Sequence, residues 1–325
     1  MELVEKMRAG SQQALARLIS YVEQESSDTT QILKEIYPYL GSGYVIGITG
    51  PPGAGKSTLT SRLTAVLRQK GFSVGIIAAD PTSPFSGGAV LGDRIRMQEH
   101  FLDDKVFIRS MATRGSHGGL PTTTPGVVKL MDAYGMNYII VETVGVGQTE
   151  LEIMETADTT VLVLVPEAGD TIQTMKAGIF EIADVFVVNK ADRPGADDMV
   201  SELKGMLHIS PQKDWWTAPV AATQAVNNIG VEELFEAIIA HRKCLEDTGR
   251  LVNRRKEQRK KEFIQTVEER ARRGLWQLIE SDKRLMPYLD KVEAGTIDPY
   301  SAAIDLLTNR EILNDWTAQA LNIKF

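Results

Sequence analysis

The residues with the clearest chemical potential form the run GPPGAGKST, which directly follows the apolar run YVIGIT. It fits the pattern G-x-x-x-x-G-K-[ST], in which glycines let backbone N–H groups turn toward phosphate oxygens. Lys56 is expected to reach the β- and γ-phosphates, and Ser57 to offer its hydroxyl to Mg²⁺. A glycine-rich turn that binds nothing is the alternative, but an amphipathic helix after the run favours a phosphate loop whose helix directs its positive end at the nucleotide. The candidate nucleotide-binding residues are Gly50, Gly53, Ala54, Gly55, Lys56, Ser57 and Thr58.

Three acidic residues follow apolar runs or loops in a way that suggests metal binding. Asp80 ends GIIAA, Glu142 ends YIIV, and Asp93 follows the loop PTSPFSGGA near the start of a helix. Ligands of a parallel sheet lie at the C-terminal edge of its strands, so these acids and Ser57 are candidate Mg²⁺ ligands. Many GTP-hydrolysing proteins carry Asp-x-x-Gly where this chain has Glu-Thr-Val-Gly, and the Glu142 arm is longer by about 1.5 Å. The alternatives are a turn cap for Asp80, a helix N-cap for Asp93 and a solvent-facing acid for Glu142.

The run VVNKAD carries a signal for the base of the nucleotide. Asn189, Lys190 and Asp192 stand at the end of an apolar run. A carboxylate accepts hydrogen bonds from guanine N1–H and its exocyclic amine, whereas adenine presents a reversed edge and is rejected. A strand followed by a polar turn is the alternative, but the position after a phosphate loop predicts GTP or GDP as ligand. Ala222 and Thr223 are weaker candidates on the guanine side.

The elements that must position these residues alternate along the middle of the chain. Val- and Ile-rich runs are typical of parallel strands covered on both faces, and they alternate with helical segments. We predict an α/β P-loop NTPase fold with a mainly parallel sheet flanked by helices. The predicted strands are residues 44–49, 73–79, 105–110, 137–142, 159–165, 185–190 and 217–222.

Helical segments without clear strands flank this region. We predict an N-terminal helical extension at 1–42, a G domain at 43–245 and a C-terminal helical extension at 246–325, in which a further helix follows the turn at Asp298. Its basic run, Arg254 to Lys261, is interpreted as a solvated helix face or a dimer seam.

The composition excludes several classes. A net charge of −7 over 325 residues argues against a nucleic-acid binder. One cysteine, Cys244, suits a reducing compartment. No secretory signal is expected at the N-terminus, and the apolar runs are too short to span a bilayer, so we expect a cytoplasmic protein that binds no membrane.

In combination, GPPGAGKST, DPTSPFSGGAVLGDRIRM, ETVGVGQTE and DTIQTMKAGIFEIADVFVVNKAD resemble the MeaB/ArgK-type G proteins. That family includes the methylmalonic aciduria type A protein and consists of chaperones of cobalamin-dependent acyl-CoA mutases. The resemblance covers most of residues 43–195. It implies that Glu142 replaces the usual Asp as a magnesium-site acid, and that Asp80 and Asp93 are the other metal-site acids.

The same resemblance implies a partner and an assembly. Residues 167–178 would form a switch loop that carries Lys176 toward a partner-controlled active site, and the helix at 254–281 would supply a homodimer contact. The expected function is a GTPase that gates cobalamin loading and the protection or reactivation of methylmalonyl-CoA mutase or a related acyl-CoA mutase.

The candidate catalytic residues are Lys56, Asp93, Glu142, Gln148 and Lys176. Gln148 is a candidate to orient water, or simply a polar helix start, and Lys176 is equally well interpreted as a solvated helix residue. No residue is placed as a permanent arginine finger, so slow hydrolysis and stimulation by a partner are expected. The alternatives are a nickel or zinc metallochaperone, which would need Cys/His ligands, and a small-molecule kinase, which would need an acceptor pocket.

Overall fold

The protein is described by a computed structural model. The described residues are 2–80, 97–112, 120–144, 150–168, 183–209, 214–281 and 283–322. The chain divides into two compact units, Met1–Arg255 and Lys256–Phe325, and each is described by itself. Among the described residues, none of the helices combines the length and the apolar character that a membrane crossing requires.

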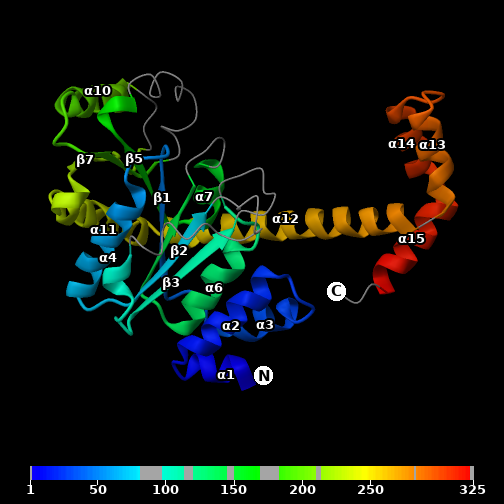
Figure 1. The fold of residues 1–325 in the computed structure, drawn as a ribbon, viewed down its shortest axis with the longest axis horizontal. Helices are drawn as coiled ribbons and strands as arrows, with labels where there is room; N and C mark the ends of the chain where they lie inside the picture. The colour runs from blue at the N-terminus through cyan, green and yellow to red at the C-terminus, as the bar shows by residue number, and fades with distance from the viewer. Residues whose placement is uncertain are drawn as a thin grey trace. The chain divides into compact units, whose positions relative to one another are not determined.

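The first unit is built on a seven-stranded sheet in the order β3-β2-β4-β1-β5-β6-β7 (Figure 1). Every pairing between neighbouring strands is parallel, as predicted from the apolar runs. Each predicted strand is present, with ends that differ by at most a few residues. The strands are β1 Tyr44–Thr49, β2 Val74–Asp80, β3 Val106–Ala112, β4 Tyr138–Glu142, β5 Thr159–Leu164, β6 Val185–Asn189 and β7 Val220–Thr223.

Helices cover both faces of this sheet, which explains why the central strands β1, β4, β5 and β6 are buried along their whole length and are largely apolar. Successive side chains of a strand point to opposite faces. Ile46 and Ile140 therefore pack on the side of α4 and α11, while Val45 and Ile139 pack on the side of α6 and the N-terminal helices. Among the described residues, the helices that lie wholly in this unit are α1 Glu2–Arg8, α2 Gln12–Glu23, α3 Thr29–Ile36, α4 Lys56–Gln69, α6 Thr124–Tyr134, α7 Glu150–Thr156, α10 Ala196–Ile209 and α11 Val231–Asp247, with short 3₁₀ turns η1 Tyr37–Tyr39, η2 Gln98–His100, η3 Pro166–Ala168 and η4 Ala225–Asn227.

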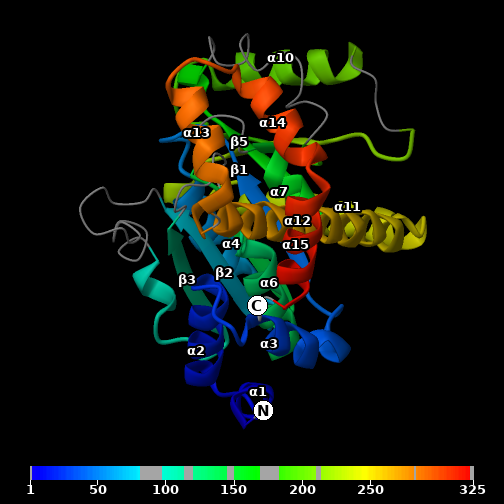
Figure 2. The same cartoon turned by 90° about the vertical axis from the view of Figure 1, so that its right-hand side faces the viewer.

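The predicted N-terminal helices are present, and they gather against α6 (Figures 1 and 2). Leu15, Leu18 and Ile19 of α2 are buried in the same apolar cluster as the α6 side chains. The Ser11 hydroxyl accepts a hydrogen bond from the Ala14 N–H at 3.2 Å and so caps α2. These helices complete the core of the first unit; the domain boundaries given above stay a prediction.

Helix α12, Arg250–Ser281, begins in the first unit with two ion pairs at the N-terminal edge of the sheet. Arg254 Nη1 lies 3.1 Å from Asp184 Oδ2, and Arg255 Nη2 lies 2.7 Å from Asp158 Oδ2. Both carboxylates are buried. Burial alone would lower the pKa of Arg255, but the hydrogen bond and charge of Asp158 raise it overall. The interpretation of the basic run as a solvated face is therefore wrong for its first two residues, and the dimer seam stays a prediction.

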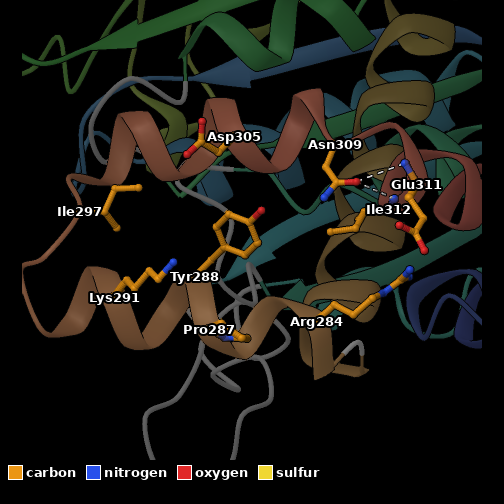
Figure 3. Close-up of a pocket in the computed structure, with 9 residues that line it drawn as sticks. All are labelled: Arg284, Pro287, Tyr288, Lys291, Ile297, Asp305, Asn309, Glu311 and Ile312. Atoms are coloured by element: carbon orange, nitrogen blue, oxygen red, sulfur yellow. Dashed lines mark hydrogen bonds between the residues drawn. The ribbon is translucent and has the colours of Figure 1, made fainter.

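The second unit is helical. Beyond the end of α12 it contains η5 Lys283–Leu285, α13 Met286–Glu293, α14 Pro299–Thr308 and α15 Arg310–Asn322, so the helix predicted after Asp298 is confirmed. Its small core is formed by Leu285, Ile312 and Trp316. A cavity of about 400 Å³ lies among α13, α14 and α15 (Figure 3), and none of the nucleotide motifs contributes to its lining. It is lined by Arg284, Pro287, Tyr288, Lys291, Ile297, Asp305, Asn309, Glu311 and Ile312.

Candidate nucleotide-binding site

The sheet order brings the separate motifs to one edge. Strand β1, which leads into the phosphate loop, lies between β4 and β5. Ile48 of β1 pairs with Glu142 at the end of β4, and Asn189 at the end of β6 pairs with Thr223 at the end of β7. The C-terminal ends of parallel strands form the ligand-binding edge of such sheets. Glu142 and the phosphate loop are therefore neighbours although they are far apart in sequence.

Two glycines of the phosphate loop are required by its close packing. Gly50 has φ +141°, and a Cβ at this residue would lie 2.0 Å from the Val163 carbonyl oxygen. Gly55 has φ +88°, and a Cβ there would lie 2.4 Å from Asn189 Nδ2. L side chains rarely adopt these φ values, so any other residue would shift the loop backbone. The loop then enters α4 at Lys56, with the helix N-terminus facing the loop.

The Lys56 ammonium lies within the phosphate loop. Its Nζ donates hydrogen bonds to the carbonyl oxygens of Gly50 at 2.8 Å and Pro51 at 3.1 Å. The side chain is buried, with 6% of its surface exposed. A buried positive charge surrounded by a turn of backbone amides is suited to binding phosphate oxygens.

Glu142 lies beside Ser57, as its strand-end position predicts. Ser57 Oγ donates a hydrogen bond to Glu142 Oε1 at 2.6 Å, and Thr60 Oγ1 donates one to Oε2 at 3.0 Å. Glu142 is 3% exposed, so it is not a solvent-facing acid. A hydroxyl and a carboxylate at this separation are the hard oxygen donors that Mg²⁺ prefers, so these residues fit a magnesium site.

A pair of threonines fixes the strand end that carries Glu142. The hydroxyls of Thr49 and Thr143 lie 2.9 Å apart, and the Thr143 N–H donates to the Ile48 carbonyl oxygen at 3.1 Å. Both threonines are buried. Through Thr143, the residue after Glu142, the end of β4 is thus bonded to the end of β1, from which the phosphate loop begins.

On the guanine side, Asn189 joins three segments. Its Nδ2 donates to the Ala54 carbonyl oxygen of the phosphate loop at 2.8 Å. Its Oδ1 accepts hydrogen bonds from Thr223 Oγ1 at 3.0 Å and from the Ala225 N–H at 3.1 Å. Thr223 is thereby buried against the motif, whereas Ala222 is exposed.

The run Asn-Lys-x-Asp that begins with Asn189 also includes Lys190, which is partly exposed, and Asp192, which is exposed. Lys190 has a left-handed backbone with φ +56°. Arg193, the next residue, forms an ion pair with Glu167 of η3, and its hydrogen bond lowers the pKa of that carboxyl. The base-side loop is thereby linked to the residue with which the expected switch loop begins.

Four residues that the sequence predicts for the site have side chains outside the described part of the structure. Asp80 ends β2, in the strand beside Glu142, but its side chain lies outside the described part of the structure. Asp93, Gln148 and Lys176 lie outside the described residues altogether.

Thr60 and the Thr49–Thr143 pair are not among the residues predicted from the sequence motifs. For Thr60 a signal was available, because it lies three residues after Ser57 and such pairs share a helix face. For the two threonines there was none, because only strand pairing brings them together.

The parallel sheet, the phosphate loop before α4 and the motif at the end of β6 define a P-loop GTPase. The family described as "Methylmalonyl Co-A mutase-associated GTPase MeaB" matches residues 15–278, and this chain belongs to that family.

The chain is similar over most of its length to the following three proteins. It is 50% identical over 306 residues to a "Putative GTPase" of Pyrococcus abyssi, covering 93% of this chain and 94% of that protein. It is 32% identical over 325 residues to the "Methylmalonic aciduria type A homolog, mitochondrial" of Caenorhabditis elegans, covering 93% and 80%. The crystal structure of the "LAO/AO transport system kinase" is similar with a TM-score of 0.71, 28% identity and coverage of 94% and 95%.

Proposed function

We propose that this GTPase is a chaperone that gates cobalamin loading and the protection or reactivation of methylmalonyl-CoA mutase or a related acyl-CoA mutase. The observation that carries the proposal is the family match over residues 15–278, since the family is described as mutase-associated. The similarity to the methylmalonic aciduria type A homolog supports the same client class.

The site supports a division of roles among the described side chains. We assign Lys56 to the β- and γ-phosphates and Asp192 to the guanine edge, with Asn189 holding the two loops together. Ser57 and Glu142 are the described side chains that would hold Mg²⁺, with Asp80 and Asp93 as further proposed ligands. The chemistry that a bound Mg²⁺ supplies is neutralisation of charge on the phosphate oxygens. Gln148 stays a candidate for orienting the attacking water. Lys176 stays a candidate for a catalytic residue whose position the partner controls.

The partner dependence can be tested by single-turnover GTP hydrolysis with and without a candidate cobalamin mutase. We expect slow hydrolysis alone, at about 10⁻⁴–10⁻² s⁻¹, and a clear acceleration by the client. Co-purification in GDP and in a non-hydrolysable GTP analogue should give different amounts of complex. A fast rate that the mutase leaves unchanged, together with equal co-purification in both nucleotides, would contradict the proposal.

We further propose that the chain forms a homodimer through α12. Phe263 and Val267, four residues apart on this helix, are 69% and 50% exposed in the single chain. Apolar side chains at this spacing share one helix face and favour burial against another surface. Phe263→Glu should shift the mass measured by light scattering from dimer to monomer, whereas Glu262→Gln on the same helix should not. A monomeric wild-type protein would exclude the dimer.

A small-molecule kinase is the second candidate, and the similar solved structure, which is named a kinase, is the observation in its favour. The guanine-type motif at Asn189 weighs against it. Product analysis separates the two, because a phosphorylated acceptor instead of inorganic phosphate would identify a kinase. A nickel or zinc metallochaperone would need a cluster of metal ligands. The described ranges contain no group of three or more His, Cys, Asp or Glu side chains that could hold a metal ion.

A further inference from the structure

Thr60, on the helix that follows the phosphate loop, contacts Glu142, the proposed magnesium-site acid. It lies on α4 one helical turn after Ser57 and is fully buried. Its hydroxyl donates to Glu142 Oε2 at 3.0 Å, while Ser57 donates to Oε1 at 2.6 Å. Each oxygen of the carboxylate therefore has its own hydroxyl donor from the same helix.

The second donor matters because a glutamate has one more side-chain torsion than an aspartate. Its terminal torsion is broad, so a carboxylate held at one oxygen still rotates. Hydrogen bonds to both oxygens of Glu142 remove that freedom and orient Oε1 toward Ser57. The donors share a helix that also carries Lys56, so the phosphate, hydroxyl and carboxylate groups keep one geometry.

The environment of Thr60 shows that its hydroxyl is used for this contact. A helical threonine commonly donates to a carbonyl oxygen of the preceding turn. Thr64, one turn further along α4, does so, since its Oγ1 donates to the Thr60 carbonyl oxygen at 2.7 Å. Thr60 instead donates across to Glu142. Both threonines are fully buried, so they form a matched pair that differs in its acceptor.

We propose that Thr60 is a positioning residue that holds Glu142 in the orientation required for magnesium binding. This inference rests on the proposed magnesium role of Glu142. It also explains how a glutamate serves where many GTPases carry the shorter aspartate: the extra carbon is accommodated by a second hydroxyl, three residues after the first.

The test measures the affinity for a fluorescent GDP while Mg²⁺ is titrated, and the midpoint is the Mg²⁺ concentration at which half of the gain in affinity is reached. This readout is independent of hydrolysis. For Thr60→Val we expect this concentration to rise about tenfold, because a hydrogen bond to a charged group is lost. GDP affinity in EDTA should stay within about twofold of wild type, since the phosphate loop and the base motif are untouched. Thr60→Ser should restore the wild-type midpoint, and Thr64→Val should leave it unchanged.

The outcomes separate this inference from the proposal on which it rests. If Glu142→Gln leaves the Mg²⁺ midpoint unchanged, the magnesium role of Glu142 is wrong. If Glu142→Gln shifts the midpoint and Thr60→Val does not, only the role of Thr60 is wrong. Should Thr60→Val fail to fold, Thr60→Ala also lacks the hydroxyl without placing a methyl group beside the carboxylate. A wild-type midpoint for Thr60→Ala would overturn the inference, as would an equal shift in Thr64→Val.

Discussion

Replacing Asn189 by alanine should weaken the site more than the loss of one side chain suggests. Asn189 is 2% exposed and takes part in three hydrogen bonds, to Ala54, Thr223 and Ala225. A typical intramolecular hydrogen bond contributes about 1 kcal/mol net, so the three together contribute about 3 kcal/mol. The partner atoms lie in buried residues, and water reaches them poorly after the substitution.

The first assay is equilibrium unfolding in urea. We expect the free energy of unfolding of the first unit to fall by about 3 kcal/mol in Asn189→Ala. For a unit of roughly 250 residues this corresponds to a fall in Tm of about 6–12 °C. Asn227→Ala is the matched control, because the Asn227 side chain is exposed and donates to Gln224 at 3.0 Å. Its change should stay within about 0.5 kcal/mol.

The second assay is GDP affinity. Asn189 holds the phosphate loop to the base-side loops, so its removal should reduce affinity even though no contact between Asn189 and the nucleotide is required. Asn189→Asp keeps the acceptor for Thr223 and Ala225 but cannot donate to the Ala54 carbonyl oxygen when ionised. It should therefore retain the β7 contact and still lose affinity. Wild-type stability and affinity in both variants would refute the reasoning.

Three further predictions follow from single contacts. Gly50→Ala should reduce GDP affinity by about tenfold or more in a fluorescence titration, because its strained backbone and the clash with β5 displace the phosphate loop; unchanged affinity would contradict the loop geometry. Arg255→Ala should lower the free energy of unfolding by about 3 kcal/mol in urea, because the buried Asp158 carboxylate loses its partner; a change below about 0.5 kcal/mol would contradict this assignment. The hydrogen bond from Arg68 lowers the pKa of Asp103 below its ordinary 3.8. The pair's contribution is therefore full above that value and lost as pH falls through the lowered pKa, so the difference in urea midpoint between wild type and Asp103→Asn should shrink below pH 3.8.

The strands were predictable because their residues carry the signal locally. Two-sided burial favours apolar residues at consecutive positions, and the Val- and Ile-rich runs of β1, β4, β5 and β6 show this pattern. The phosphate loop was predictable for a similar reason, since glycine is required where a side chain would clash, as at Gly50 and Gly55. The edge position of Glu142 followed from the rule that ligands gather at the C-terminal ends of parallel strands.

Other features depended on distances between segments that no local pattern records. The basic run at the start of α12 has the composition of a solvated face, yet Arg254 and Arg255 reach buried carboxylates at the N-terminal edge of the sheet. Their charge predicted exposure, and only the packing of α12 showed that a partner offsets the cost of burial.

The sequence by itself determined the class of ligand, because phosphate and guanine recognition depend on residues that are consecutive or nearly so. The tertiary structure alone decided which side chains hold that machinery in place. Thr60, Thr143 and Thr223 act through hydroxyls whose hydrogen-bond partners lie on other elements of the fold. A hydroxyl has no preferred partner until the fold brings an acceptor within about 3 Å, so its role cannot be predicted from its residue type.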